Sequence, residues 1–102
     1  MRIQNTKRLG TSWTNAEIEA VWRKGVVVPG YNPAVYRQDA CNAWIERTQH
    51  GRETKYGLEI DHIMPVSQGG SDDLSNLQPL NWANNRHKAD HWPYWSCAVQ
   101  AQ

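Results

Sequence analysis

The stretch that decides the fold is residues 58–90, which read LEIDHIMPVSQGGSDDLSNLQPLNWANNRHKAD. Apolar side chains at its start predict a β-strand that ends near Pro65, and the Gln-Gly-Gly-Ser run at 68–71 predicts a turn. Leucines spaced through 74–80 predict a second, shorter strand. Residues 81–90 suit a helix, so the expected order is strand, long loop, strand and helix.

Several residues in this stretch recur at the spacing of a known motif. They are Glu59-Ile-Asp61-His62-Ile63, Pro65, Gly69-Gly70, Asn76-Leu77-Gln78, Leu80, Asn85 and Lys88. Together they resemble the HNH nuclease family, and the resemblance covers about a third of the chain. It implies an α+β fold with a small ββα-metal core, also called the His-Me finger, and we expect an additional helical segment before it.

The resemblance also implies a chemistry. Hydrolysis of a phosphodiester needs an activated water and neutralisation of charge on the phosphate and the leaving oxygen. His62 is the predicted general base, because a neutral imidazole accepts a proton near physiological pH. Asp61 and Asn85 are the predicted ligands of a single divalent metal ion, and their oxygens suit Mg²⁺ or Mn²⁺ better than zinc. Asn85 stands where many family members have histidine, so the chain resembles a His-Asn-Asn variant.

Further polar residues receive roles from the same resemblance. Asn76, the middle Asn of the motif, is expected to tie the loop between the strands together and to hold His62 in a productive orientation. Lys88 and Arg86 are predicted to contact the phosphate oxygens of a nucleic acid. Glu59 is either an auxiliary metal ligand or a solvated strand residue, and we favour the second interpretation.

Many HNH domains also carry two Cys-x-x-Cys pairs that bind a structural zinc. The first pair is represented here at best by Cys41-x-x-Trp44, and the second pair by Asn81 and Asn84. Since three of the four thiols are missing, we expect no structural zinc. Apolar packing by Trp44, Trp82 and their neighbours would then have to substitute for it.

Composition sets the wider limits. The 102 residues fit one domain, and six Trp and four Tyr with no Phe are expected to supply much of a thin core. No signal-peptide pattern or membrane-length apolar run is visible, which predicts a cytoplasmic protein that does not enter membranes. Cys41 and Cys97 are accordingly predicted to be reduced.

The charge is unevenly distributed. The net charge of +1 argues against a protein that holds its partner by electrostatic attraction alone. Residues 1–58 carry nine Lys/Arg against five Asp/Glu, and residues 59–102 carry two against five. The acidic second segment would repel a nucleic acid unless a cation were bound in it, whereas the basic first segment is expected to help hold the substrate.

The residues outside the motif are expected to support it. Residues 1–57 form a helical and extended segment of the same domain, 58–90 the catalytic core, and 91–102 a tail that packs on the core. Within the first segment the predicted pieces, in order, are a loosely ordered 1–11, a capped helix over 14–24, an extended run at 26–28, a helix over 34–43, a strand over 44–48 and a loop over 49–57.

Other conspicuous residues are interpreted without a function. Asp72 and Asp73 are expected to be solvated loop residues or a helix cap. His87 and His91 are expected to be a surface pair rather than a metal site. The aromatic cluster Trp92–Trp95 could stack on bases, but we expect it to pack back on the core.

The predicted function is a metal-dependent endonuclease that nicks or cuts DNA with low sequence specificity. Two alternatives stay open: a nucleic-acid-binding module that has the fold without activity, and a nuclease subunit of a larger phage or restriction complex. These residues do not distinguish DNA from RNA, the strandedness of the substrate, or a monomer from a dimer.

Overall fold

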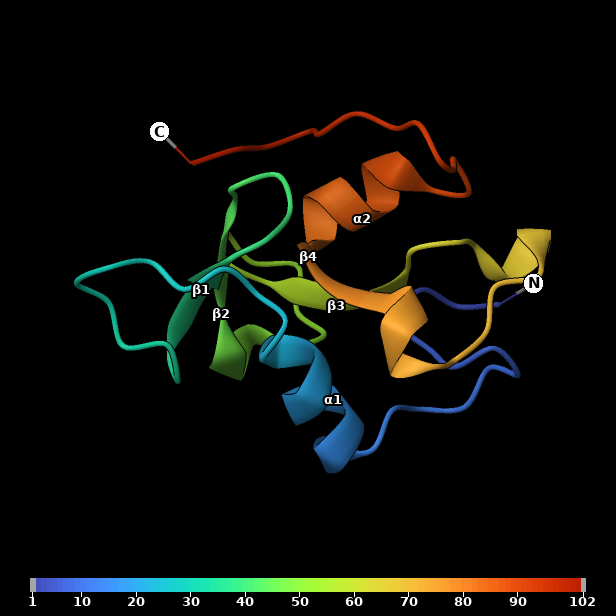
Figure 1. Ribbon diagram of the computed structural model, residues 1–102, viewed down its shortest axis with the longest axis horizontal. Coiled ribbons are helices and arrows are strands. Elements are labelled where there is room, and N and C mark those ends of the chain that lie inside the picture. The colour runs from blue at the N-terminus through green and yellow to red at the C-terminus, as the bar shows by residue number, and fades with distance from the viewer. Residues whose placement is uncertain (1, 102) are drawn as a thin grey trace.

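Two helices and two antiparallel strand pairs make up the computed structural model, which describes residues 2–101 (Figure 1). The helices are α1 (Asn15–Trp22) and α2 (Trp82–Lys88), and the strands are β1 (Tyr36–Gln38), β2 (Trp44–Glu46), β3 (Leu58–His62) and β4 (Leu77–Asn81). The α+β class predicted from the sequence is confirmed. Met1 and Gln102, which belong to the predicted outer segments, lie outside the described residues.

The segment predicted as strand, loop, strand and helix has that order in the structure. β3 pairs with β4 in a register that sets Leu58 opposite Asn81 and His62 opposite Leu77. Helix α2 follows β4 without a gap, because the Asn81 side chain caps it by accepting the backbone N–H of Ala83. This ββα unit carries the residues of the predicted motif.

Helix α1 begins where the sequence predicted it. The Thr14 hydroxyl accepts the Glu17 N–H, and the Glu17 carboxylate accepts the Thr14 N–H, so both halves of the capping box are formed. The helix ends at Trp22, two residues before the predicted Lys24. Its buried face packs against β4, so α1 covers the strand pair from the side opposite to α2.

The helix predicted over residues 34–43 is wrong. Residues 36–38 form β1, which pairs with β2, and Asn42 turns the chain with a φ of +60°. The carboxylate of Asp39 accepts the backbone N–H groups of Cys41 and Ala43, which a helix would have used internally. The strand predicted over 44–48 is confirmed for Trp44–Glu46, after which Arg47–Gln49 form a 3₁₀ turn.

The apolar core consists of two clusters of buried side chains. The first comprises Trp13, Ile18, Val21, Ile60 and Leu77, and the second comprises Trp22, Ile45 and Leu58. Each cluster joins the α1 region to the β3–β4 pair. No helix within residues 2–101 has the length and apolarity needed to cross a bilayer.

A buried carboxylate, that of Asp39, bonds to Asn81 and Asn84, two of the positions at which zinc ligands were considered in the sequence. Besides its two bonds within residues 39–43, Asp39 accepts the Asn81 N–H at 2.9 Å and the Asn84 side-chain amide at 3.0 Å. Asp39 and Asn84 are fully buried. Apolar packing by Trp44, Trp82 and their neighbours was expected here. Both Trp side chains are only partly buried, and a hydrogen-bonded polar network holds β1, β4 and α2 together.

The prediction of two reduced thiols is also wrong, because Cys41 and Cys97 form a disulfide. The C-terminal tail runs along α2 (Figure 1), where the Asn84 side-chain oxygen accepts the N–H groups of Ala98 and Val99. These bonds bring Cys97 beside Cys41, with a Cα–Cα distance of 5.9 Å. That distance lies within the range that disulfides require.

Reduction of this disulfide is expected to lower the free energy of unfolding by about 2–4 kcal/mol, because it closes a long loop of the unfolded chain. Chemical denaturation with and without dithiothreitol measures the effect. The double variant Cys41→Ser/Cys97→Ser is the control, since its denaturation midpoint should not respond to the reductant. Equal midpoints for the oxidised and reduced natural sequence would contradict the prediction.

Candidate active site

A cleft of about 450 Å³ lies between β3, the end of α2 and the N-terminal segment. Its walls include Asp61, His62 and Asn85, three of the residues singled out in the sequence. Arg2, Gln4, Asn5 and Asp90 also line it. The expectation of a loosely ordered start is wrong for this part of the chain, because the Asn5 side-chain oxygen accepts the Ile60 N–H at 2.8 Å.

Asp61 is held from two sides on β3. Its Oδ2 accepts the side-chain amide of Gln78, which lies directly opposite in the strand register, and its Oδ1 lies 3.3 Å from the Lys88 ammonium. Burial raises the pKa of the Asp61 carboxyl, while Gln78 and Lys88 act in the opposite direction. A cation in the cleft would favour the ionised form of this carboxylate.

The amide of Asn85 has a defined orientation. Its Nδ2 donates to Glu59 Oε1 at 2.8 Å and to Gln4 Oε1 at 3.3 Å. Both amide protons are thereby used, and no donor within residues 2–101 bonds to the Asn85 side-chain oxygen. Glu59 is buried, so the interpretation of it as a solvated residue is wrong.

The donor set fits a hard divalent cation. Asp61 and Asn85 line one cleft, and a carboxylate oxygen and an amide oxygen are ligands that Mg²⁺ and Mn²⁺ accept. Residues 2–101 hold no group of three or more His, Cys, Asp or Glu side chains that could bind a metal. An ion bound here would therefore take its remaining ligands from water or substrate, as Mg²⁺ commonly does.

His62 is buried, and within residues 2–101 its side chain has one hydrogen-bond partner. Its Nε2 lies 2.8 Å from Asp72 Oδ1, an oxygen that also accepts the Arg8 N–H at 2.8 Å. Burial alone would raise the pKa of Asp72, but the hydrogen bonds from His62 and Arg8 lower it. An ionised Asp72 can only accept, which assigns the proton to Nε2 and leaves Nδ1 of a neutral His62 with a free lone pair.

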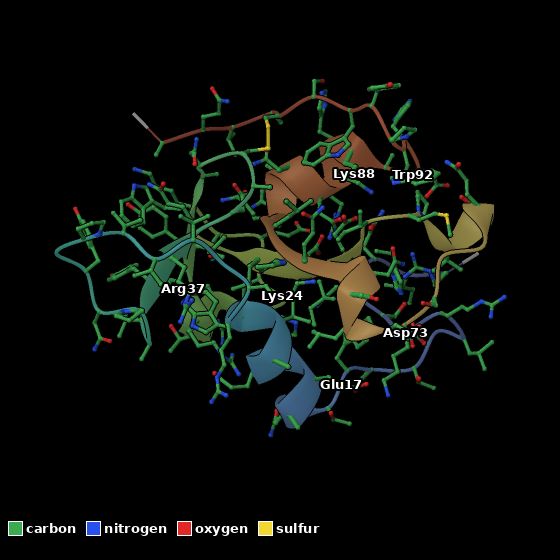
Figure 2. All side chains as sticks on the ribbon, in the orientation of Figure 1. Glu17, Lys24, Arg37, Asp73, Lys88 and Trp92 are labelled. Carbon is green, nitrogen blue, oxygen red and sulfur yellow. A yellow bond between two sulfur atoms is a disulfide. The ribbon has the colours of Figure 1, made fainter. Side chains whose placement is uncertain are left out.

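Asp72 is thus a site residue that the sequence interpretation missed. It was expected to be solvated or a cap, because nothing in its local pattern points toward a histidine ten residues earlier. Asp73, by contrast, is exposed in the same loop, as Figure 2 shows.

Asn76 bonds across the loop of residues 63–76. Its side-chain oxygen accepts the Met64 N–H, and its Nδ2 donates to the carbonyl oxygens of Met64 and Ser71. Gly70 lies so close that a Cβ there would stand 1.8 Å from the Met64 oxygen. Contacts among residues 64, 70, 71 and 76 therefore hold together the loop that joins His62 to Asp72.

Both residues predicted to contact phosphate are paired with other groups of this chain. Lys88 is fully buried on α2, where its ammonium bonds to Asp61 and to the His62 carbonyl oxygen at 3.1 Å (Figure 2). Arg86 pairs with Glu59 at 2.7 Å and with Glu53 at 3.1 Å. Of the Lys and Arg side chains in the described residues, only that of Arg2 lines the cleft.

The remaining sequence candidates lie outside the cleft. His87 is exposed and bonds to the Ser96 hydroxyl, and the His91 ring lies 2.9 Å from the Lys88 carbonyl oxygen. The aromatic cluster that was expected to pack on the core is mostly exposed at Trp92 and Tyr94.

Part of the chain is similar to known proteins. The family model described as HNH endonuclease matches residues 46–91. The chain is 51% identical over 37 residues to "Probable mobile endonuclease C" of Enterobacteria phage T4, a stretch that covers 36% of this chain and 18% of that protein. No solved structure matches the chain. The HNH resemblance predicted from Glu59 to Lys88 is confirmed.

Proposed function

We propose that this chain, whose residues 46–91 match the HNH endonucleases, hydrolyses phosphodiester bonds of DNA with the help of a divalent metal ion. The observation that carries the proposal is the shared cleft of Asp61, His62 and Asn85. A fold that had lost its activity would not be expected to retain a base and two oxygen ligands around one cleft. Low sequence specificity is proposed because no helix or strand within residues 2–101 resembles a base-reading helix.

Asp61 and Asn85 are the proposed ligands of the ion, Mg²⁺ or Mn²⁺. When bound, the ion supplies positive charge for the phosphate and the leaving oxygen in the transition state. Gln78 holds the Asp61 carboxylate, and Glu59 with Gln4 holds the Asn85 amide so that its oxygen stays available. Supporting bonds of this kind fix the direction from which ligands reach an ion.

His62 is the proposed general base. Its Nδ1 would take a proton from the water that attacks the phosphorus, while the scissile bond to the leaving oxygen breaks. The Asp72 carboxylate accepts the Nε2 proton throughout and stabilises the imidazolium that forms, as the acidic member of a hydrolytic triad does. Asn76 supports this arrangement by fastening the loop that joins the two residues.

Arg2 is the proposed contact for a substrate phosphate at the cleft, because its guanidinium can bind two phosphate oxygens at once. A phosphate contact by Lys88 or Arg86 would require the side chain to leave Asp61 or Glu59, and this role stays a prediction. The cytoplasmic location, the division into segment, core and tail, and membership of a larger phage or restriction complex also stay predictions.

Metal dependence gives the decisive test. Purified protein should nick supercoiled plasmid with Mg²⁺ or Mn²⁺ and stop when EDTA is added. Asp61→Ala should weaken Mn²⁺ binding at least about 10- to 100-fold by calorimetry, since it removes the only charged ligand. Asp73→Ala, which removes an exposed aspartate, is the matched control and should bind Mn²⁺ normally. Nicking that survives EDTA, or wild-type protein that is inert with every metal, would refute the proposal.

A further inference from the structure

Four aromatic side chains line a second, separate pocket of about 250 Å³. Its lining residues are Tyr31, Tyr36, Trp44 and Tyr56. The Tyr31 and Trp44 rings touch, with centroids 4.6 Å apart, and Tyr36 stands nearly perpendicular to both at 6.3–6.4 Å. None of the four side chains is buried, and Tyr31 is 51% exposed.

This cavity shares no lining residue with the active-site cleft. It lies on β1, β2 and their flanking loops, which form one end of the molecule in Figure 1, whereas the N-terminal segment that lines the cleft lies toward the other end. An adjoining cavity of about 570 Å³ shares Trp44 and Tyr56 and continues to Trp82 at the start of α2. The aromatic surface therefore extends over both cavities.

Lys55 is the one charged residue among those that line these two cavities. No Asp or Glu lines either of them, and Lys55 lines the larger one. The Lys55 ammonium lies 5.6 Å from the Tyr56 ring centroid, so a cation already faces that ring. A second cation would be repelled, whereas a planar ring attached to an anionic backbone matches both the rings and the charge.

We propose that the pocket of Tyr31, Tyr36, Trp44 and Tyr56 binds an unpaired base of a single-stranded nucleic acid, with Lys55 contacting a neighbouring phosphate. The proposal rests on the proposed function in that the substrate is a nucleic acid. The cavity is smaller than the roughly 300–1,000 Å³ of drug-sized sites, which suits one planar base. Stacking on aromatic rings tolerates any base, in keeping with low sequence specificity.

Fluorescence anisotropy in EDTA tests the pocket without cleavage. A labelled single strand of about 20 nucleotides suffices, since the 38 Å length of the molecule corresponds to about 11 steps of 3.4 Å. Tyr31→Ala should raise the Kd for this strand about tenfold, as expected for one lost stack. Lys55→Gln should raise it and make the salt slope shallower by about 0.7. Leu9→Ala, which removes a leucine that is 90% exposed outside the pocket, should change neither.

Photocrosslinking of the unmodified protein gives a readout that does not depend on the folding of a variant. A single strand carrying 5-iodouracil should crosslink to peptides that contain Tyr31, Tyr36, Trp44 or Tyr56. The proposed base-binding role of the pocket would be refuted by any of three results: no such crosslinks, an unchanged Kd for Tyr31→Ala, or no single-strand binding by the wild-type protein. If the protein nicks plasmid but gives any of these three results, the proposed nuclease activity stands and only the pocket's role is refuted. If binding depends on the pocket but no nicking occurs, only the proposed nuclease activity is refuted.

Discussion

Replacement of His62 by alanine is expected to lower the rate of plasmid nicking by about 10²–10⁴-fold, the usual contribution of a general base. The reason lies in the geometry of the ring. The Asp72 carboxylate accepts a hydrogen bond from Nε2 of His62, so Nδ1 is the ring nitrogen that remains to take a proton. No other histidine lines the cleft, so the loss has no substitute among the described residues. Single-turnover nicking at saturating Mg²⁺ measures it.

Two variants make this result specific. His87→Ala removes an exposed histidine outside the cleft and should nick at the wild-type rate. Asp72→Asn keeps the size of its side chain but loses the charge that stabilises the imidazolium, so its rate should fall between wild type and His62→Ala. Mn²⁺ affinity should stay unchanged in His62→Ala, because that residue is not a proposed ligand. A His62→Ala protein that nicks as fast as wild type would refute the assignment of the base.

Replacement of Asp39 by alanine is expected to destabilise the fold by about 4 kcal/mol or more. The side chain accepts four buried N–H groups, from Cys41, Ala43, Asn81 and Asn84. Each donor left unpaired inside the protein costs about 1–3 kcal/mol. Urea denaturation under oxidising conditions measures the change in the free energy of unfolding.

The matched variant for this test is Asp39→Asn. Its remaining oxygen can still serve Cys41 and Ala43, but its NH₂ group would face the N–H donors of Asn81 and Asn84. Its loss of stability should therefore fall between those of wild type and alanine. Equal stability of Asp39→Ala and wild type would mean that the network is not what holds β4 and α2 to the β1–β2 hairpin.

Asp39→Ala should also disturb the proposed active site, because Asn84, which binds Asp39, and Asn85, which lines the cleft, are neighbours on α2. Asn84 binds Asp39 on one side and the C-terminal tail on the other, whereas Asn85 points into the cleft. A helix that loses its Asp39 anchor would also lose the position of the Asn85 oxygen. The structural network and the proposed metal site thus share one short helix.

Local patterns in the sequence were enough to predict the ββα order, the cap of α1 and the HNH resemblance. The cap depends on two residues three positions apart, Thr14 and Glu17, and the resemblance depends on residues between Glu59 and Lys88 that recur at the spacing of a known motif. Such features are fixed by periodicity and short-range hydrogen bonds, which the sequence displays directly.

Only the tertiary structure decided which side chains pair across long stretches of the chain. Asp39 reaches Asn84 across 45 positions, and Cys41 reaches Cys97 across 56. The pairing of His62 with Asp72, the burial of Lys88 against Asp61, and the meeting of four aromatic rings likewise result from how the segments pack. Residues far apart in the chain leave no shared local pattern, so a glutamine, an aspartate or a tyrosine acquires its role only when folding brings its partner within bonding distance.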